Sequence, residues 1–313
     1  MAPRLDVGIA LGYGKDEERL GHVLAADARH AESVGLESLW TGDQLISDLA
    51  SMPDSTLVLA TVAAATERIR LGFAVMVLSQ RPVAWAAKQI ATLQRLSGNR
   101  VLLGIGVGDE KHGWDGFRAA GVDHRERGKL TDEALALLPD LVRGKPCVFG
   151  GETVRLAPAA PMPPLLFGGR AAAIRRCLRH GGTWMAAIDA PAKVFAQVPG
   201  IAEEAASAGV PVPEVVITVG LALGNPTAED LDRQVRILGA HGLTEAEANA
   251  TILRGSADDG AEFLASLAEA GATRVVGVPF SGDWHEQTEL LGEAAARLPG
   301  TTSTAVEPTR GER

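Results

Sequence analysis

Residues 66–108 constrain the fold of this chain more than any other segment. A nearly continuous apolar run over 69–78 has the length and composition of a buried strand, and a second such run covers 101–107. Between them, residues 82–97 repeat apolar side chains every three or four positions, which is typical of an amphipathic helix. This order predicts a βαβ unit, in which two parallel strands lie in a sheet covered by helices.

The alternation of strand and helix continues on both sides of this unit. We expect further strands over 5–11, 38–41, 165–167, 183–187, 215–222 and 274–279. We expect further helices over 17–34, 55–66, 125–142, 170–180, 192–208, 226–254, 258–270 and 284–298, with a break at His241 and Gly242 inside the sixth. About eight strands in βα alternation predict an α/β fold, a (β/α)8 TIM barrel.

Two segments fall outside this repeat. Residues 144–156 have the pattern of a β-hairpin that turns at Gly150 and Gly151, and we interpret them as a small insertion. Residues 300–313 lack apolar periodicity, so we expect a flexible C-terminal tail. Residues 1–299 would then form a single domain.

Composition and charge exclude several classes of protein. No uncharged apolar run reaches the roughly 18 residues of a membrane span, and the early Asp6 is unlike a secretory signal, so we expect a cytoplasmic protein that does not bind membranes. The formal net charge of −9 argues against nucleic-acid binding, which needs a basic surface. Cys147 and Cys177 lie far apart and form no metal-binding pattern, which favours buried free thiols.

In such a barrel, functional side chains lie on the loops that follow the strands. Asp43 follows the second strand, where it either caps the next turn or serves a ligand. The run Gly104-Ile105-Gly106-Val107-Gly108 follows the fourth strand, but Asp109 replaces the third glycine of a dinucleotide fingerprint. We therefore interpret these glycines as positions where a flat ring approaches the backbone. Asp109, Glu110 and His112 follow and supply titratable groups that could take part in chemistry. The alternative is that they lie on a solvated loop without such a role.

The fifth strand ends at a second candidate, formed by Gly168, Gly169 and Arg170. Free N–H groups and the dipole of the following helix favour an anion site there. The alternative, which is equally favoured, is that the two glycines only allow a tight turn.

The aromatic and histidine patterns add little to these candidates. Trp85 and Trp184 lie in periodic segments, so we expect both in the core, whereas Trp114 lies in a loop and could line a pocket. The seven histidines have no metal-ligand spacing, and neither a GxSxG elbow nor a Walker A motif occurs. We therefore expect no metal site, no serine hydrolase and no nucleoside-triphosphate site.

Four segments together resemble the bacterial luciferase-like family of flavin- and deazaflavin-dependent oxidoreductases. They are AESVGLESLWTGDQ (31–44), ATERIRLGFAVMVLSQRPVAWAAKQIATLQRLSGNRVLLGIGVG (65–108), GFRAAGVDHRERGKLTDEALALL (116–138) and PLLFGGRAAAIRRCLRHGGTWM (164–185). They cover most of the first 185 residues, and the second of them is specific. The resemblance implies a TIM barrel whose mouth holds FMN or the deazaflavin coenzyme F420, often in a homodimer.

The resemblance also implies roles for individual residues. Asp43 falls where family members place an acidic residue near the ring system. Ala74 and Val75 match a strand end where deazaflavin enzymes carry a non-proline cis peptide that backs the ring, so we expect a cis bond there. Gln44 stands where sugar-phosphate dehydrogenases of the family have His, and Asp109 where they have Glu. Since Gln44 cannot accept a proton at neutral pH, a close copy of that reaction is not expected. The phosphate-contacting turn corresponds to Gly168, Gly169 and Arg170.

The leading hypothesis is F420-dependent hydride transfer to or from a small organic substrate, with Asp109 or His112 moving the proton and Gln44 forming a hydrogen bond. The alternative is an FMN-dependent monooxygenase that uses O2. A hypothesis of another class is a cofactor-free barrel that acts as a binding protein. A sugar-processing barrel that uses Asp43 and Asp109 as paired carboxylates is disfavoured by an aromatic content of only 4%.

Overall fold

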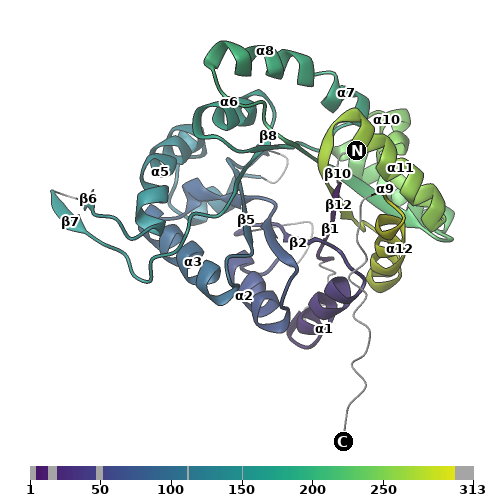
Figure 1. The fold of residues 1–313 in the computed structure, drawn as a ribbon, viewed down its shortest axis with the longest axis horizontal. Coiled ribbons are helices and arrows are strands. Elements are labelled where there is room, and N and C mark those ends of the chain that lie inside the picture. The colour runs from purple at the N-terminus through teal and green to yellow at the C-terminus, as the bar shows by residue number, and fades with distance from the viewer. Residues whose placement is uncertain (1–4, 13–19, 47–51, 111–112, 150, 300–313) are drawn as a thin grey trace, which may run out of the picture.

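A closed barrel of eight parallel strands forms the body of the protein (Figure 1). The computed structural model describes residues 5–12, 20–46, 52–110, 113–149 and 151–299. Neighbouring strands pair in the order in which they occur, and the ring closes where the last strand pairs with the first. The barrel strands are β1 (Asp6–Ala10), β2 (Ser38–Thr41), β3 (Arg70–Phe73), β5 (Val101–Gly106), β8 (Leu165–Gly169), β9 (Thr183–Ala186), β10 (Val215–Leu223) and β12 (Ala272–Val278). The predicted (β/α)8 fold is confirmed.

Helices surround the barrel, as Figure 1 shows. Strand side chains that point outward pack against the apolar faces of these helices in one large core. Side chains that point inward fill the barrel itself, one from each of six strands: Trp40, Leu102, Leu166, Met185, Val216 and Val276. The helices are α1 (Leu20–Ser33), α2 (Ser55–Ala65), α3 (Val83–Leu96), α4 (Asp115–Ala119), α5 (Arg127–Val142), α6 (Ala171–His180), α7 (Pro191–Phe195), α8 (Val198–Ala208), α9 (Ala228–Ala240), α10 (Glu245–Thr251), α11 (Ala257–Ala270) and α12 (Trp284–Ala296). Short 3-10 helices lie at Leu78–Gln80 and His124–Glu126.

Other predictions are confirmed outside the barrel. The predicted hairpin is present as β6 (Cys147–Phe149) and β7 (Glu152–Val154), which pair antiparallel and project from the body (Figure 1). Position 150 of its turn lies outside the described residues, as does the expected tail at 300–313. Both cysteines are buried and free, as expected. Within the described residues, no helix is long and apolar enough to cross a membrane.

Three predicted elements are interrupted in the structure. The apolar run 69–78 forms β3 and a separate strand, β4 (Met76–Val77), instead of one continuous strand. The predicted helix 192–208 is split into α7 and α8, because Pro199 occupies the first turn of a new helix. The predicted helix 226–254 consists of α9 and α10, each opened by a capping box, followed by the strand β11 (Ile252–Gly255), which pairs with β10.

The prediction that Trp85 lies in the core is wrong. Its side chain is 67% exposed, because the buried face of α3 is formed by Ala86, Ile90 and Leu93, and position 85 points away from that face. Trp184 is only 2% exposed and lies in the core as predicted.

Arg274 joins three strands near the N-terminal end of the barrel. Its guanidinium is buried and donates to Asp6 at 2.8 Å and to both carboxylate oxygens of Glu37 at 2.9 and 3.1 Å. Since Asp6 starts β1 and Glu37 precedes β2, this triad links β12 to the first two strands across the point of closure.

We predict that Arg274→Met lowers the free energy of unfolding by about 3 kcal/mol, because it removes the buried cation that two partly buried carboxylates share. Chemical denaturation monitored by circular dichroism measures this change. The matched control is Arg68→Met, which removes an exposed pair with Glu67 and should cost less than about 0.5 kcal/mol. Equal losses in the two variants would contradict the role assigned to Arg274.

Candidate functional site

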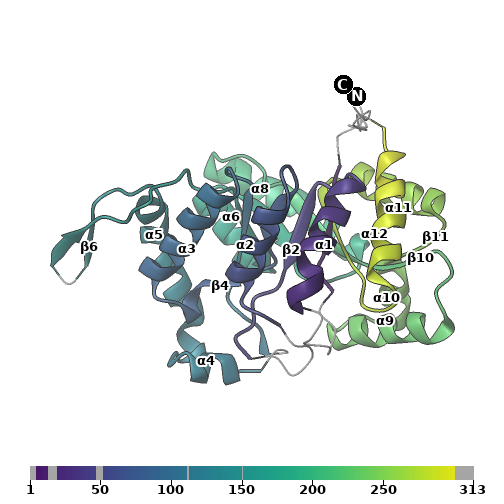
Figure 2. The same ribbon diagram turned by 90° about the horizontal axis from the view of Figure 1, so that it is seen from below.

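The loops that follow the strands meet at one end of the barrel, where α4 and α9 also lie (Figure 2). We call this end the mouth. The loops after β2, β3, β5 and β8 are neighbours there, because these strands are consecutive in the ring. The structure therefore brings together most of the candidate residues from the sequence.

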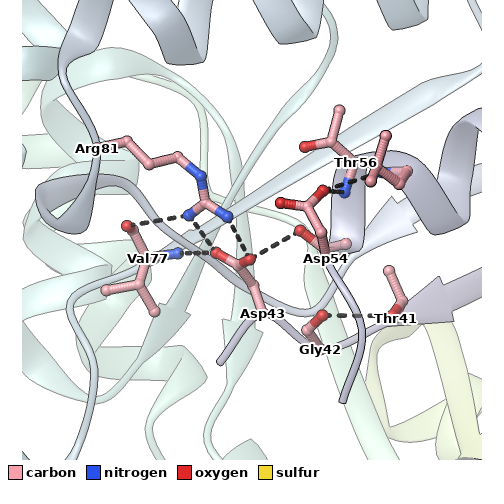
Figure 3. A network of polar contacts seen from close by, with 9 residues as sticks. Thr41, Gly42, Asp43, Asp54, Thr56, Val77 and Arg81 are labelled. Atoms are coloured by element: carbon pink, nitrogen blue, oxygen red, sulfur yellow. Dashed lines mark hydrogen bonds and ion pairs between the residues drawn. The ribbon is translucent and has the colours of Figure 1, made fainter. Parts of the chain in front are cut away.

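Asp43 lies at the centre of a buried polar network (Figure 3). One carboxylate oxygen accepts hydrogen bonds from Ser55 Oγ at 2.8 Å and from Arg81 Nη2 at 2.5 Å. The other accepts from the Val77 amide at 2.8 Å and from Arg81 Nη1 at 2.6 Å. The carboxylate thus links the loop after β2 to the start of α2 and to β4.

The charge of Asp43 also acts on its partner. Burial lowers the pKa of Arg81, but the hydrogen bonds and the negative charge of Asp43 outweigh it and leave that pKa above its ordinary value. Asp54 caps α2 by accepting the amides of Thr56 and Leu57, so the Asp43 carboxylate is not the cap of this helix. Contact between Asp43 and a cofactor stays a prediction.

Ala74 and Val75 form the tip between β3 and β4, and the expected cis peptide bond between them is confirmed. The Ala74 amide donates to the Thr41 carbonyl at 2.8 Å. Both tip residues are half-buried, although the side chains of Phe73 and Met76 on either side are completely buried. The tip therefore keeps an open side at the mouth.

Glycines on two neighbouring strands make room for this tip. A methyl group on Gly104 would overlap the Phe73 carbonyl oxygen, and one on Gly106 would overlap Val75 Cγ2. On β8, a methyl group on Gly168 would lie 2.7 Å from Val75 Cγ1. A side chain at Gly104 or Gly106 would therefore collide with the strand tip, which explains why both positions are glycine. Cofactor contact at Gly106 stays a prediction.

Gly108 has a different neighbour. Its φ of +77° is left-handed, and a methyl group there would lie 2.8 Å from the Phe117 ring. Phe117 belongs to α4, and Trp114 just before that helix stacks on His124 at 4.3 Å between ring centroids. The Arg127 guanidinium lies over the same indole ring at 4.9 Å. Gly108 therefore fits closely against this aromatic cluster at the mouth, and its contact with a cofactor also stays a prediction.

The turn at the end of β8 has the features of an anion site. Gly169 is the last residue of the strand, with φ +130°, and its carbonyl accepts the indole N–H of Trp184 at 2.7 Å. Arg170 precedes α6, its side chain is mostly exposed, and Nη1 donates to Asp189 at 2.6 Å. The first-turn amides of α6 and the Arg170 guanidinium could together bind a phosphate group.

Two of the residues proposed for chemistry, Gln44 and Asp109, lie on two loops of the mouth. Gln44 is half-buried beside Asp43, whereas Asp109 and Glu110 are exposed after β5. His112 lies outside the described residues. Because β3 and β4 separate β2 from β5, Gln44 and Asp109 flank the tip from opposite sides.

Sequence reasoning missed Arg81 as the partner of Asp43. The two residues are 38 positions apart, so local periodicity gives no indication of the pair. One signal was available, since a cation just before the start of a helix is unfavourable for the helix dipole unless an anion is near.

We predict that Gly106→Ala lowers the free energy of unfolding by about 2 kcal/mol, because its methyl group collides with Val75. The double variant Val75→Ala/Gly106→Ala should recover part of this loss, since it removes the colliding carbons. Thermal and denaturant unfolding measure both. In the control Gly200→Ala, on α8, the new methyl group meets no atom within 4 Å, and no loss is expected. Strictly additive effects at positions 75 and 106 would contradict the packing described here.

Comparisons with solved structures find the same fold. An F420-dependent secondary alcohol dehydrogenase in complex with an F420-acetone adduct has a TM-score of 0.76 at 19% identity, over 94% of this chain and 99% of that one. The oxygenating constituent of 3,6-diketocamphane monooxygenase from Pseudomonas putida, in complex with FMN, has a TM-score of 0.75 at 17% identity, with the same coverage. A coenzyme F420-dependent tetrahydromethanopterin reductase from Methanopyrus kandleri has a TM-score of 0.70 at 20% identity, over 92% of this chain and 97% of that one.

Sequence comparisons give the family. Uncharacterized proteins of Mycobacterium bovis and Mycobacterium tuberculosis are each 36% identical over 152 residues, which is 46% of this chain and 51% of theirs. The match thus spans about half the length of these curated relatives. The family model described as luciferase-like monooxygenase matches residues 4–295. Since that match runs through nearly the whole chain, this protein belongs to the luciferase-like monooxygenase family.

Proposed function

We propose that this protein is an F420-dependent oxidoreductase that transfers a hydride to or from a carbon of a small organic substrate. The observation that carries the proposal is the half-exposed tip at Ala74 and Val75, which is held in place within an otherwise buried strand end. A flat ring system needs a rigid backing that leaves one face open to the substrate, and this tip supplies one.

The residues at the mouth fit such a cofactor. The Asp43 and Arg81 network fixes the tip through the Val77 amide, so the backing would not move when a ring binds. Arg170 and the start of α6 offer positive potential for a phosphate at the end of β8, which is separated from β3 by β5. The deazaflavin, when bound, would supply the two-electron redox chemistry.

The protein would then contribute orientation and proton transfer. Asp109, on the loop after β5, and His112 are the proposed groups for moving the substrate proton. Gln44 would donate or accept a hydrogen bond but would hold no transferable charge. We expect selectivity to come from the loops around the mouth, because their side chains can vary without disturbing the barrel.

The alternative is an FMN-dependent monooxygenase that uses O2. Both an F420-dependent and an FMN-containing enzyme share this fold, so the fold supports either cofactor. We favour F420 because Asp43 follows the second strand in a Trp40-Thr41-Gly42-Asp43 context. The third possibility is a cofactor-free barrel that acts as a binding protein.

We predict that the fluorescence of F420 is quenched when it binds to this protein. The affinity for F420 should fall about tenfold in Arg170→Ala, because a charged contact to phosphate is lost. Fluorescence titration with purified F420 and, separately, FMN measures both affinities. Arg175→Ala, an exposed arginine on the same helix, is the matched control and should leave affinity unchanged. Tight FMN binding without F420 binding would contradict the preferred cofactor, and no binding of either would favour the cofactor-free protein.

We also propose a homodimer that forms through α2 and α3. Leu57 on α2 is 70% exposed, and Trp85 and Leu96 on α3 are 67% and 61% exposed. The two α3 residues are eleven positions apart, which is about three turns, so they lie on one face. Large exposed apolar side chains on adjacent helices are typical of an interface between copies.

We predict that Trp85→Lys converts the dimer to a monomer, because it places a charge within this apolar face. Size-exclusion chromatography with light scattering measures the mass. Val212→Lys is the control, since Val212 is also exposed but lies away from α2 and α3. A wild-type monomer, or a Trp85→Lys dimer, would overturn the proposed interface.

A cytoplasmic location remains our proposal. The two cysteines are unpaired and buried, and burial raises the pKa of the Cys177 thiol to about 12. Free thiols of this kind suit a reducing compartment. No partner other than a small-molecule substrate and a second copy of the chain is proposed.

A further inference from the structure

The turn at the end of β8 is in contact with the loop that follows β9. The Ala187 amide donates to the Gly169 carbonyl at 3.3 Å, and two residues later Asp189 begins the approach to α7. One carboxylate oxygen of Asp189 accepts the Ala190 amide at 2.9 Å, and the other accepts from Arg170 Nη1 at 2.6 Å. The Asp189 side chain is 13% exposed, whereas that of Arg170 is 61% exposed. A mostly buried carboxylate thus lies beside the arginine that is proposed to contact a phosphate.

Asp189 occupies only part of the Arg170 guanidinium. An arginine carries five N–H donors in a planar fork, and only Nη1 donates to a partner among the described residues. A second anion could therefore bind the same guanidinium while Asp189 keeps its place. Any phosphate held by Arg170 would then share its positive charge with Asp189.

The next cation on this loop does not make up for that shared charge. Lys193 of α7 lies 2.5 Å from Glu247 of α10. The hydrogen bond to Glu247 is the chief reason that the pKa of Lys193 is raised; the negative charge of Asp189 also raises it, and the positive charge of Arg170 lowers it. These two cations and two anions therefore act on one another and together carry no net charge.

The positive potential that remains at the turn comes from the start of α6. A helix N-terminus is equivalent to about half an elementary charge, which suits an anion of low charge. A phosphodiester carries one negative charge, whereas a phosphomonoester carries about 1.5 to 2 at pH 7. The second charge of a phosphomonoester would meet the Asp189 carboxylate without a further cation to balance it.

We propose that Asp189 selects the charge of the bound phosphate, so that the turn accepts a phosphodiester and disfavours a phosphomonoester. This inference rests on the proposed function and names the class of phosphate at that site. F420 contains a phosphodiester and FMN a phosphomonoester, so the same carboxylate favours F420 over FMN. Asp189 acts through its charge and through Arg170, and it is a positioning residue that does not itself bind the phosphate.

The test uses four ligands that combine two ring systems with two phosphate charges. They are FMN, its phosphate methyl ester, the 5′-phosphate of the deazaflavin riboside of F420, and the methyl ester of that phosphate. Fluorescence titrations with the full-length protein, at about pH 8 and low salt, measure the four dissociation constants. Wild type should bind each methyl ester about tenfold more tightly than its parent phosphate. In Asp189→Asn, which keeps an acceptor in place and removes the charge, this preference should disappear through tighter binding of the phosphomonoesters.

Asp132→Asn is the matched control. It removes the carboxylate that pairs with Arg176 of the same helix at 2.7 Å, and Arg176 lies more than one turn beyond Arg170. This variant should keep the preference for the methyl esters, and circular dichroism verifies that each variant is folded. If Asp189→Asn does not fold, titration of wild type at rising salt replaces it, because screening of these partly exposed charges should reduce the preference.

Equal binding of phosphate and methyl ester by wild type would overturn the proposal. An unchanged preference in folded Asp189→Asn, or a preference that does not respond to salt, would also overturn it. A purely structural ion pair between Asp189 and Arg170 predicts a loss of stability in Asp189→Asn without any change in the preference for the methyl esters.

The four ligands separate this inference from the proposed function. A preference for the methyl esters that depends on Asp189, in a protein that binds the flavin ring better than the deazaflavin ring, would support the role of Asp189 and overturn the proposed cofactor. Better binding of the deazaflavin ring without a preference for the methyl esters would do the reverse. No binding of any of the four would overturn both.

Discussion

The buried carboxylate of Asp43 is the interaction on which the candidate site depends. A buried charge is stable only when it is paired and its lone pairs are used, and here four donors from Ser55, Val77 and Arg81 meet that need. These donors belong to three different segments, so the carboxylate fixes the end of the second strand against the tip of the third. The tip at Ala74 and Val75 is thereby held from the side while its own face stays half exposed.

The mouth consequently has two unlike sides. On one side, β5 and β8 present glycines against the tip, so that backbone and one valine side chain form a closely fitted surface. On the other side, α9 covers the end of β10, where Gln234 packs against Gly220 and its Oε1 has no hydrogen-bond partner among the described residues.

Much of this fold follows from the periodicity of the sequence. The short strand 38–41 matches its prediction residue for residue, because a run of buried residues is bounded by the charged Glu37 and by Gly42. The interruption after Phe73 was missed, since the apolar run 69–78 contains no polar break that would mark it. Strand β11 was missed because most of its residues fall inside the segment 226–254, which was predicted to be helical.

The sequence predicted where the candidate site lies in the barrel, but not which contacts hold its residues. Position after a strand is a local property, and it identified Asp43, Gly106 and Gly168. Partners are a property of the folded chain, so Arg81 and the unpaired oxygen of Gln234 could not be read from sequence spacing.

The central claim is that the Ala74 and Val75 tip backs a flat redox ring. A crystal structure of the protein with F420 tests it most directly. The account predicts difference density for the deazaflavin ring in van der Waals contact with this tip, at about 3.5 to 4 Å, with its phosphate near Arg170. Ring density elsewhere in the mouth, with the tip in contact with solvent or side chains only, would contradict it.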